Sequence, residues 1–263
     1  MSLGTNSPGV HAAAELLLAS ADAVADREPL TDTWPEFDLG TAYAVQDEAL
    51  RLRRARGETL IGVKLGLTSR AKQQRMGIDS PLLGWLTDAM VLPAGEPVPH
   101  AELIHPRAEP ELVFLLGKRL TGPGVTAASA LDAVSAVYGG IEIIDSRYRD
   151  FRFQLPDVVA DNASSARFVL GPVGLDPSTV DLTLEAALVE VDGQIVDTAT
   201  GAAVQGHPAQ ALALAANALG ERGLALEAGW LVLTGGMTDA VEVRPGSRVA
   251  AHFSHLGSVT LAG

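Results

Sequence analysis

The sequence contains no cysteine, so the protein cannot use a thiol nucleophile, form a disulfide or bind a metal through thiolates. Cations are also scarce, because 19 lysine and arginine residues stand against 32 aspartate and glutamate residues and the formal net charge is −13. A field of this sign argues against a nucleic-acid partner. It also repels a dianionic substrate, which would therefore need a local cation in order to bind.

Long apolar runs are missing as well. No run approaches the roughly 18 consecutive apolar residues of a membrane span. The N-terminus also lacks the basic segment and apolar stretch of a signal peptide. We therefore expect a soluble, cytoplasmic protein without a membrane partner.

The chain has enough apolar residues for a hydrophobic core, since 47% of its 263 residues are hydrophobic. Residues 11–26 and 38–55 are predicted helices in an N-terminal, mainly helical part that we expect to span residues 1–93. The turn-rich segment Pro93-Ala94-Gly95-Glu96-Pro97 is the best candidate for a boundary. Residues 94–263 are then expected to form a β-rich catalytic domain.

Short strand patterns dominate this second part. Asp192-Gly193 predicts a hairpin between two of them, and residues 126–138 and 208–220 are predicted helices. Helices at the start of the chain and strands towards its end make α+β the expected fold class.

Two carboxylates stand two residues apart at the start of a strand-like run that ends at Leu116. Glu109 and Glu111 should project from the same face of an extended chain, roughly 6.5–7 Å apart. A third carboxylate, Glu142, lies in the apolar run 138–144. Oxygen donors in apolar surroundings favour Mg²⁺ or Mn²⁺ over zinc, so the pattern indicates a metal site. The alternative is that these are surface glutamates of an edge strand.

A lysine stands in the middle of the predicted strand 59–67. Lys64 either lies on an exposed face or points into a polar pocket, because lysine is almost never fully buried without a partner. Ser69 is expected to cap a short helix through Met76, and residues 79–88 are expected to form a loop.

A long polar segment, residues 144–165, separates two apolar strands, and loops of that length are usually functional.

The other candidate site residues carry less weight. His252 and His255 would face opposite sides of a strand. His207 precedes a predicted helix and is expected to be structural. Thr234-Gly235-Gly236 lacks the lysine and spacing of a phosphate loop.

Several of these segments together resemble the 2-keto-4-pentenoate hydratase and 4-oxalocrotonate decarboxylase family of the fumarylacetoacetate hydrolase superfamily. The resemblance covers nearly the whole chain from about residue 40 and is closest to the decarboxylase branch. It rests on residues 62–68, Glu109-Pro110-Glu111, residues 144–151 and 155–165, and Thr234-Gly235-Gly236. It implies a mixed β-roll or sandwich domain after the helical part, and an enzyme.

The resemblance also implies roles for particular residues. Glu109, Glu111 and Glu142 match the metal ligands of the family, Lys64 matches a lysine that reaches into the pocket, and Ser164 matches a serine that holds the substrate carboxylate. Arg147 is expected to bind substrate as well. A small oxo-dicarboxylate is the expected substrate. A homo-oligomer is expected, and a complex with a pentadienoate hydratase of the same family is allowed.

One position departs from the hydratase pattern. Leu82 stands where hydratases carry an aspartate for acid/base chemistry, and hydration needs a proton shuttle there whereas loss of CO₂ does not. The expected reaction is therefore metal-dependent decarboxylation of 2-oxo-3-hexenedioate (4-oxalocrotonate) to 2-hydroxy-2,4-pentadienoate, in meta-cleavage catabolism of aromatic compounds. The rivals are a hydratase, a carbon–carbon hydrolase, which would need a water-activating histidine, and a non-catalytic oxo-acid binder or structural subunit.

Overall fold

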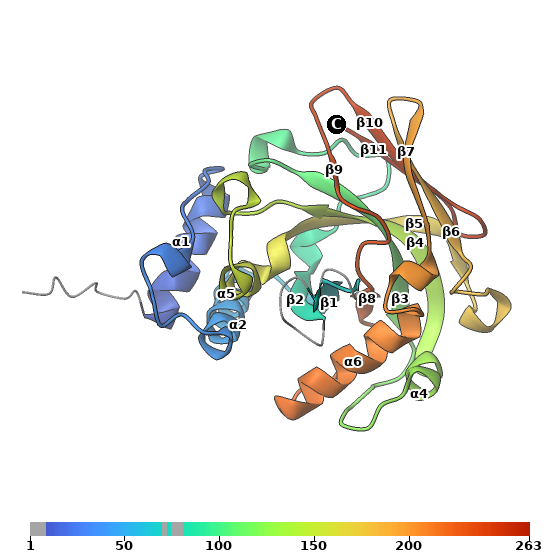
Figure 1. Ribbon diagram of the computed structural model, residues 1–263, viewed down its shortest axis with the longest axis horizontal. Helices are drawn as coiled ribbons and strands as arrows, with labels where there is room; N and C mark the ends of the chain where they lie inside the picture. The colour runs from blue at the N-terminus through green and yellow to red at the C-terminus, as the bar shows by residue number, and fades with distance from the viewer. Residues whose placement is uncertain (1–8, 70–72, 75–80) are drawn as a thin grey trace, which may run out of the picture.

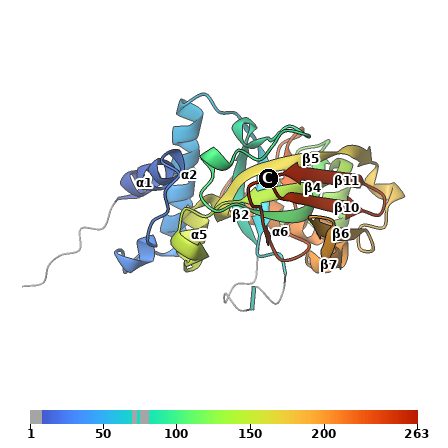
Figure 2. The ribbon, with the colours of Figure 1, turned by 90° about the horizontal axis from the view of Figure 1, so that it is seen from above.

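The computed structural model of the protein describes residues 9–69, 73–74 and 81–263. Some of the helices gather at one end of the molecule, and two sheets with the remaining helices beside them form the rest, as Figures 1 and 2 show from two directions. This arrangement confirms the α+β class. No described helix combines the length and the apolar character that crossing a membrane requires.

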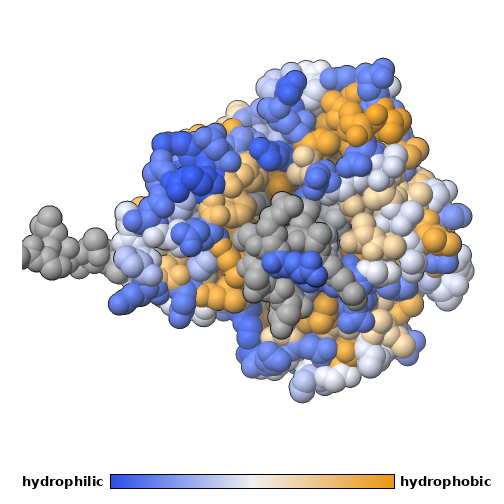
Figure 3. Space-filling model, in the orientation of Figure 1, coloured by the Kyte–Doolittle hydropathy of each residue, from blue (hydrophilic) through white to orange (hydrophobic). Residues whose placement is uncertain are grey.

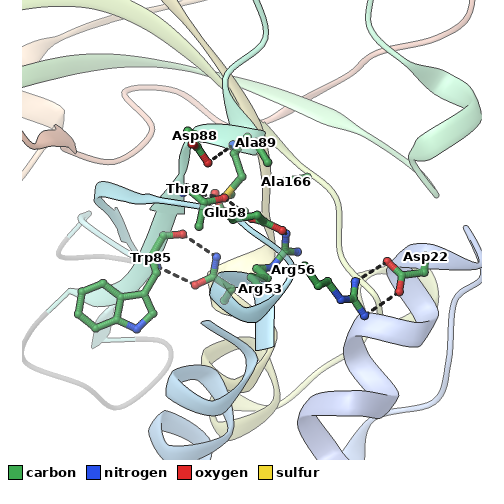
Figure 4. Close-up of polar contacts among 12 residues, drawn as sticks. Asp22, Arg53, Arg56, Glu58, Trp85, Thr87, Asp88, Ala89 and Ala166 are labelled. Atoms are coloured by element: carbon green, nitrogen blue, oxygen red, sulfur yellow. Dashed lines mark hydrogen bonds and ion pairs between the residues drawn. The ribbon is translucent and has the colours of Figure 1, made fainter. Parts of the chain in front are cut away.

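The helical end consists of α1 (Val10–Asp22), α2 (Leu39–Ala55) and the short α5 (Leu155–Ala160). The Asp38 side chain caps α2 by accepting a hydrogen bond from the Thr41 amide at 2.7 Å. The apolar faces of the three helices meet in one cluster. At the surface Arg56, the residue directly after α2, forms an ion pair with Asp22 of α1 at 3.0 Å, and Figure 4 shows this pair.

A mixed sheet forms the centre of the molecule, with strand order β2-β1-β8-β3-β4-β5 and β9 paired with β3. Strands β1 and β8 run parallel, and the other neighbours are antiparallel. The strands are β1 (Leu60–Gly66), β2 (Leu82–Thr87), β3 (Arg107–Leu116), β4 (Val134–Ile144), β5 (Ser165–Leu175), β8 (Leu231–Leu233) and β9 (Val241–Glu242).

The second sheet has strand order β11-β10-β6-β7. Its strands are β6 (Ala186–Val191), β7 (Gln194–Thr200), β10 (Arg248–Phe253) and β11 (Gly257–Ala262). The predicted hairpin is confirmed, since Asp192 and Gly193 both have positive φ and join β6 to β7. The two sheets pack closely where the Phe253 ring lies over Gly139 of β4, because a Cβ there would stand 2.4 Å from the ring.

Two more helices, α4 (Ala127–Leu131) and α6 (Pro208–Glu221), complete the described elements apart from 3₁₀ turns. His207 is structural, as expected: its Nδ1 caps α6 by accepting a hydrogen bond from the Ala209 amide at 3.0 Å. The 3₁₀ turns are Leu30–Asp32, Asp88–Met90, His100–Glu102, Arg149–Phe151, Asn162–Ser164, Pro177–Thr179 and Gly201–Ala203.

Two predicted elements differ from the structure. The helix predicted over residues 126–138 ends at Leu131, because the apolar run from Val134 onward pairs with β3 over its whole length. Residues 82–87 were expected in a loop and form β2, since every residue of this segment is buried and pairs with β1. The predicted helix 69–76 and the beginning of the predicted loop, residues 79–80, lie outside the described residues, apart from Ser69, Gln73 and Gln74.

The division at residue 93 stays a prediction. Strands β1 and β2 precede it in sequence, yet β1 pairs with β8 beyond it in the same sheet. The sheet therefore brings Lys64 of the first part beside the residues of the second.

Candidate active site

The three glutamates predicted as metal ligands come together on one face of the central sheet. Glu109 and Glu111 alternate along β3, and Glu109 lies opposite Glu142 in the antiparallel pairing of β3 with β4. One carboxylate oxygen of each lies within 4.8 Å of the others. Glu111 and Glu142 are fully buried, and Glu109 is partly buried. Like charges this close are unfavourable unless a cation balances them.

The electrostatics of the cluster fit a divalent cation. Burial, followed by the charge of Glu142, raises the pKa of Glu111 well above its ordinary value. Glu111 Oε1 is buried and has no hydrogen-bond partner among the described residues. Carboxylate oxygens are the ligands that Mg²⁺ and Mn²⁺ prefer, so the donor set and its unmatched oxygen fit such an ion.

Lys64 points into the same cluster from β1. Its Nζ lies 2.9 Å from Glu142 Oε2 and donates a hydrogen bond to the carbonyl oxygen of Ala163 at 2.9 Å, and the side chain is 3% exposed. Burial by itself would lower the pKa of Lys64, but the carboxylates of the cluster outweigh it and raise the pKa above its ordinary value. Of the two predicted placements, the polar pocket is therefore the one observed.

Thr234-Gly235-Gly236 makes room for the carboxylates, a role that the sequence did not reveal. The Gly235 amide donates a hydrogen bond to Glu111 Oε2 at 2.7 Å. A Cβ on Gly235, whose φ is +104°, would stand 2.1 Å from Thr68 Oγ1, and a Cβ on Gly236 would stand 2.8 Å from the carboxyl carbon of Glu109. Only glycine fits these close approaches, of Gly235 to Thr68 and of Gly236 to Glu109.

Ser164 reaches the site from a strained turn. Asn162, Ala163 and Ser164 all have positive φ, and such backbone persists only where its surroundings hold it in place. Asn162 is held by two hydrogen bonds to the Trp85 backbone, at 2.7 and 2.9 Å; Figure 4 shows Trp85 at this point. The Ser164 hydroxyl is buried without a hydrogen-bond partner among the described residues and lines the cavity.

Arg147 does not reach the cavity as expected for a substrate-binding residue. Its guanidinium pairs with the carboxylate and carbonyl of Asp161 and donates to the carbonyl oxygens of Asp145 and Ser165. It is 6% exposed and is not among the described residues that line the cavity. The backbone of its own loop takes up its donors, so the structure places it behind Ser164 rather than against a substrate.

A cavity of about 570 Å³ opens beside the carboxylates. Leu82, at the beginning of β2, lines it. The cavity is lined by Lys64, Gly66, Leu67, Leu82, Arg107, Glu109, Ile144, Phe151, Phe153, Val158, Ala163, Ser164, Asp239 and Ala240. It thus joins a charged end, with Lys64 and Glu109, to an apolar wall.

A sequence model of the fumarylacetoacetate hydrolase C-terminal family matches residues 59–261, which include all of these site residues. The chain belongs to the fumarylacetoacetate hydrolase family. Within it, the chain is 40% identical over 235 residues to a 4-oxalocrotonate decarboxylase of Pseudomonas putida, covering 89% of each chain. It is also 45% identical over 198 residues to a 2-hydroxypent-2,4-dienoate hydratase of the same species, covering 75% of this chain and 89% of the relative.

The fold is closely matched by a solved member of the family. The structure of 4-oxalocrotonate decarboxylase from Pseudomonas putida G7, complexed with magnesium and adipate, superposes with a TM-score of 0.94 at 40% identity over 96% of each chain. Since sequence relatives with decarboxylase and hydratase activity are about equally similar, overall identity does not separate the two reactions. The distinction depends on the residues that line the cavity.

Proposed function

We propose that this protein is a Mg²⁺- or Mn²⁺-dependent decarboxylase that converts 2-oxo-3-hexenedioate to 2-hydroxy-2,4-pentadienoate. The proposal is supported by the glutamate cluster with Lys64 and by family relatives named as decarboxylases. The observation that carries it is Leu82, an apolar side chain on the cavity wall where hydration would require a proton shuttle.

The residues around the cavity define how the substrate would lie. Glu109, Glu111 and Glu142 would hold the ion, and Ser164 would donate a hydrogen bond to the substrate's C1 carboxylate. When bound, the ion supplies a Lewis acid for the 2-oxo oxygen, an effect on the order of several kcal/mol. Lys64 stays cationic because its pKa is raised, and it adds a positive charge beside the same oxygen.

Decarboxylation breaks the bond between C5 and the distal carboxylate, which leaves as CO₂. The bonding electrons pass through the conjugated chain to the 2-oxo oxygen, where protonation gives the dienol. Leu82, Phe153 and Val158 give the cavity an apolar wall that excludes water from the reacting chain. Water would otherwise solvate the carboxylate and compete for the product.

The main alternative is hydration of 2-hydroxy-2,4-pentadienoate, the activity named for several relatives. We propose that the protein does not catalyse it efficiently, since position 82 supplies no carboxyl group. A carbon–carbon hydrolase is disfavoured because no histidine is among the described residues that line the cavity. A non-catalytic oxo-acid binder would show no metal-dependent turnover.

The test is to mix the protein with each substrate, with and without Mg²⁺, and follow ultraviolet absorbance and CO₂ release. We expect Mg²⁺-dependent CO₂ release from 2-oxo-3-hexenedioate and little hydration of the pentadienoate. Leu82→Asp should impair decarboxylation, because the new anion repels the distal carboxylate and draws water into the cavity. Leu82→Asn is the matched control, since asparagine has the shape of aspartate without its negative charge. Efficient hydration by the unmodified protein would overturn the assignment.

We also propose that the protein acts in the cytoplasm, in meta-cleavage catabolism of aromatic compounds, and that it forms a homo-oligomer. The oligomer is supported by exposed apolar residues near and in the β6–β7 hairpin: Leu184, Leu188, Ile195 and Val196. Apolar surface is visible on the side of the molecule where Figure 1 places β7 and β10 (Figure 3). A hydratase of the same family is the other partner that this surface would suit.

A further inference from the structure

The cavity contains a second cationic side chain that the sequence analysis did not single out. Arg107 begins β3 and alternates onto the same face as Glu109 and Glu111. It lines the cavity together with Lys64 and Glu109. We infer that Arg107 binds the distal carboxylate of a dianionic substrate and so selects dicarboxylates over monocarboxylates. The inference deepens the proposed function and rests on it for the identity of the natural substrate.

Arg107 is held in position by an aromatic platform. Its guanidinium carbon lies 4.2 Å from the centroid of the Phe151 ring, and the His105 ring also packs against Phe151, with 4.7 Å between the two centroids. Phe151 and the preceding Asp150 both have φ of +55°, a conformation that non-glycine residues rarely adopt and that clusters at functional sites. Stacking occupies the face of the guanidinium and leaves its edge, which carries the N–H donors, available to a carboxylate.

The carboxylate that lies opposite Arg107 already has another partner. The residue opposite Arg107 on β9 is Glu242, and Arg244 donates a hydrogen bond to Glu242 at 2.9 Å. No hydrogen bond or ion pair joins the Arg107 side chain to another residue of the described ranges. Arg107 is exposed at the mouth of the cavity.

The charge balance of the site calls for such a cation. Lys64 and a divalent ion together balance the three glutamates, so the first carboxylate of the substrate already makes the site negative. In a protein of net charge −13, a second carboxylate needs its own positive partner. Apart from Lys64, Arg107 is the cationic side chain that the described cavity lining provides.

The spacing also agrees with a six-carbon diacid. Residues two apart on one face of a strand are separated by roughly 6.6 Å. From standard bond lengths, the end carbons of an extended six-carbon chain are about 6 Å apart. A substrate with its oxo-acid end at the glutamates would thus bring its other carboxylate towards Arg107. Leu82 would then face the chain from the apolar wall.

The test uses two unreactive ligands that differ only in the distal group, 2-oxoadipate and 2-oxohexanoate, titrated calorimetrically with Mg²⁺ present. The unmodified protein should bind 2-oxoadipate about 10- to 100-fold more tightly, the range of one charge-assisted contact. Arg107→Gln should abolish this preference and leave the affinity for 2-oxohexanoate within about twofold. Arg119→Gln, which removes an exposed arginine outside the cavity lining, is the matched control and should keep the preference.

Turnover provides a second readout. The distal carboxylate loses its charge as CO₂ leaves, so Arg107 stabilises the bound substrate more than the transition state. Arg107→Gln should therefore raise KM for 2-oxo-3-hexenedioate about 10-fold or more and leave kcat unchanged or higher. Arg107→Lys should retain part of the preference, since it keeps the charge and loses the planar fork.

The outcomes separate this inference from the proposed function. Retention of the 2-oxoadipate preference in Arg107→Gln, or equal loss of affinity for both ligands, would overturn the Arg107 assignment. An Arg107-dependent preference in a protein that releases no CO₂ would leave the Arg107 site standing and overturn the decarboxylase instead.

Discussion

Glu111 is proposed as a metal ligand, but its burial as a charged side chain is unfavourable for folding. It is fully buried beside another carboxylate, and both effects raise its pKa. A glutamate in this position destabilises the metal-free protein and is stabilised once a cation binds. The cost is tolerated because the sheet pairing that places Glu111 also places Glu109 and Glu142.

Glu111→Gln should therefore have opposite effects on the metal-free and the metal-loaded protein. Without metal, we expect a higher Tm than for the unmodified protein, by about 2–4 °C for each kcal/mol of repulsion removed. The glutamine oxygen can still accept the hydrogen bond from Gly235. Added Mg²⁺ should raise the Tm of the unmodified protein but not that of the variant, and most activity should be lost. Calorimetry with and without Mg²⁺ measures this, and equal Mg²⁺ shifts would contradict it.

Lys64 is the second residue whose contribution to turnover can be measured separately. Lys64→Ala should lower turnover at least ~10²-fold, the usual scale for a partner of transition-state charge. Lys64→Met is the matched control for packing, because it keeps most of the aliphatic stem beside Gly84, whose Cβ position would lie 3.0 Å from that stem. Circular dichroism should show both variants folded. Turnover like that of the unmodified protein would remove Lys64 from the mechanism.

At the scale of elements, the segment from Asp145 to Ser165 determines the shape of the site. The Asp145 amide donates to the Ser164 carbonyl oxygen at 2.8 Å, and the Asp145 carboxylate accepts from the amides of Ile104 and His105. Arg147 and Asp161 form a buried ion pair in the middle of the segment. Burial raises the pKa of Asp161, and Arg147 opposes that rise. The pair therefore holds the strained turn that presents Ser164.

Arg147→Met should destabilise the protein by about 3–5 kcal/mol in urea unfolding, since it leaves the Asp161 charge buried without its partner. KM should rise with it as the Ser164 turn loosens. The double variant Arg147→Met/Asp161→Leu should recover part of the stability, because an apolar pair avoids the desolvation cost of buried charges. Arg244→Met, which breaks an exposed pair with Glu242, is the control and should change stability little.

At the scale of the whole molecule, the outer edge of strand β7 offers a surface for association. Strand β7 lies at the end of its sheet, and no described strand pairs with its outer side. Ile195 and Val196, which it carries, are 53% and 50% exposed. An apolar edge strand of this kind is normally covered by another chain, and a second copy would match it by antiparallel pairing.

Ile195→Glu should shift the protein to a smaller oligomer in sedimentation equilibrium, because a charge at the edge opposes pairing. Leu16→Glu is the control, since Leu16 is 42% exposed on α1, in the helical part of the chain. The decarboxylase activity of Ile195→Glu should persist, as the cavity does not include this hairpin. An unmodified protein that sediments as a monomer would contradict the proposal of an oligomer through β7.

The sequence by itself determined whatever depends on local periodicity. Alternation along a strand put Glu109 and Glu111 on one face, Asp192-Gly193 predicted the hairpin, and the helix predicted over residues 38–55 is α2. These features involve neighbours within a few residues, so backbone geometry alone specifies them. Their apolar surroundings also marked Glu142 and Lys64 as candidates, and the family resemblance implied their roles.

Only the tertiary structure decided which distant residues meet. Pairing of β1 with β2 turned a predicted loop into a strand and put Leu82 on the cavity wall. The same folding buried Arg147 against Asp161 and left Arg107, on the face shared with Glu109, at the cavity mouth. No local pattern distinguishes these two arginines, because what separates them is the set of partners that folding brings from elsewhere in the chain.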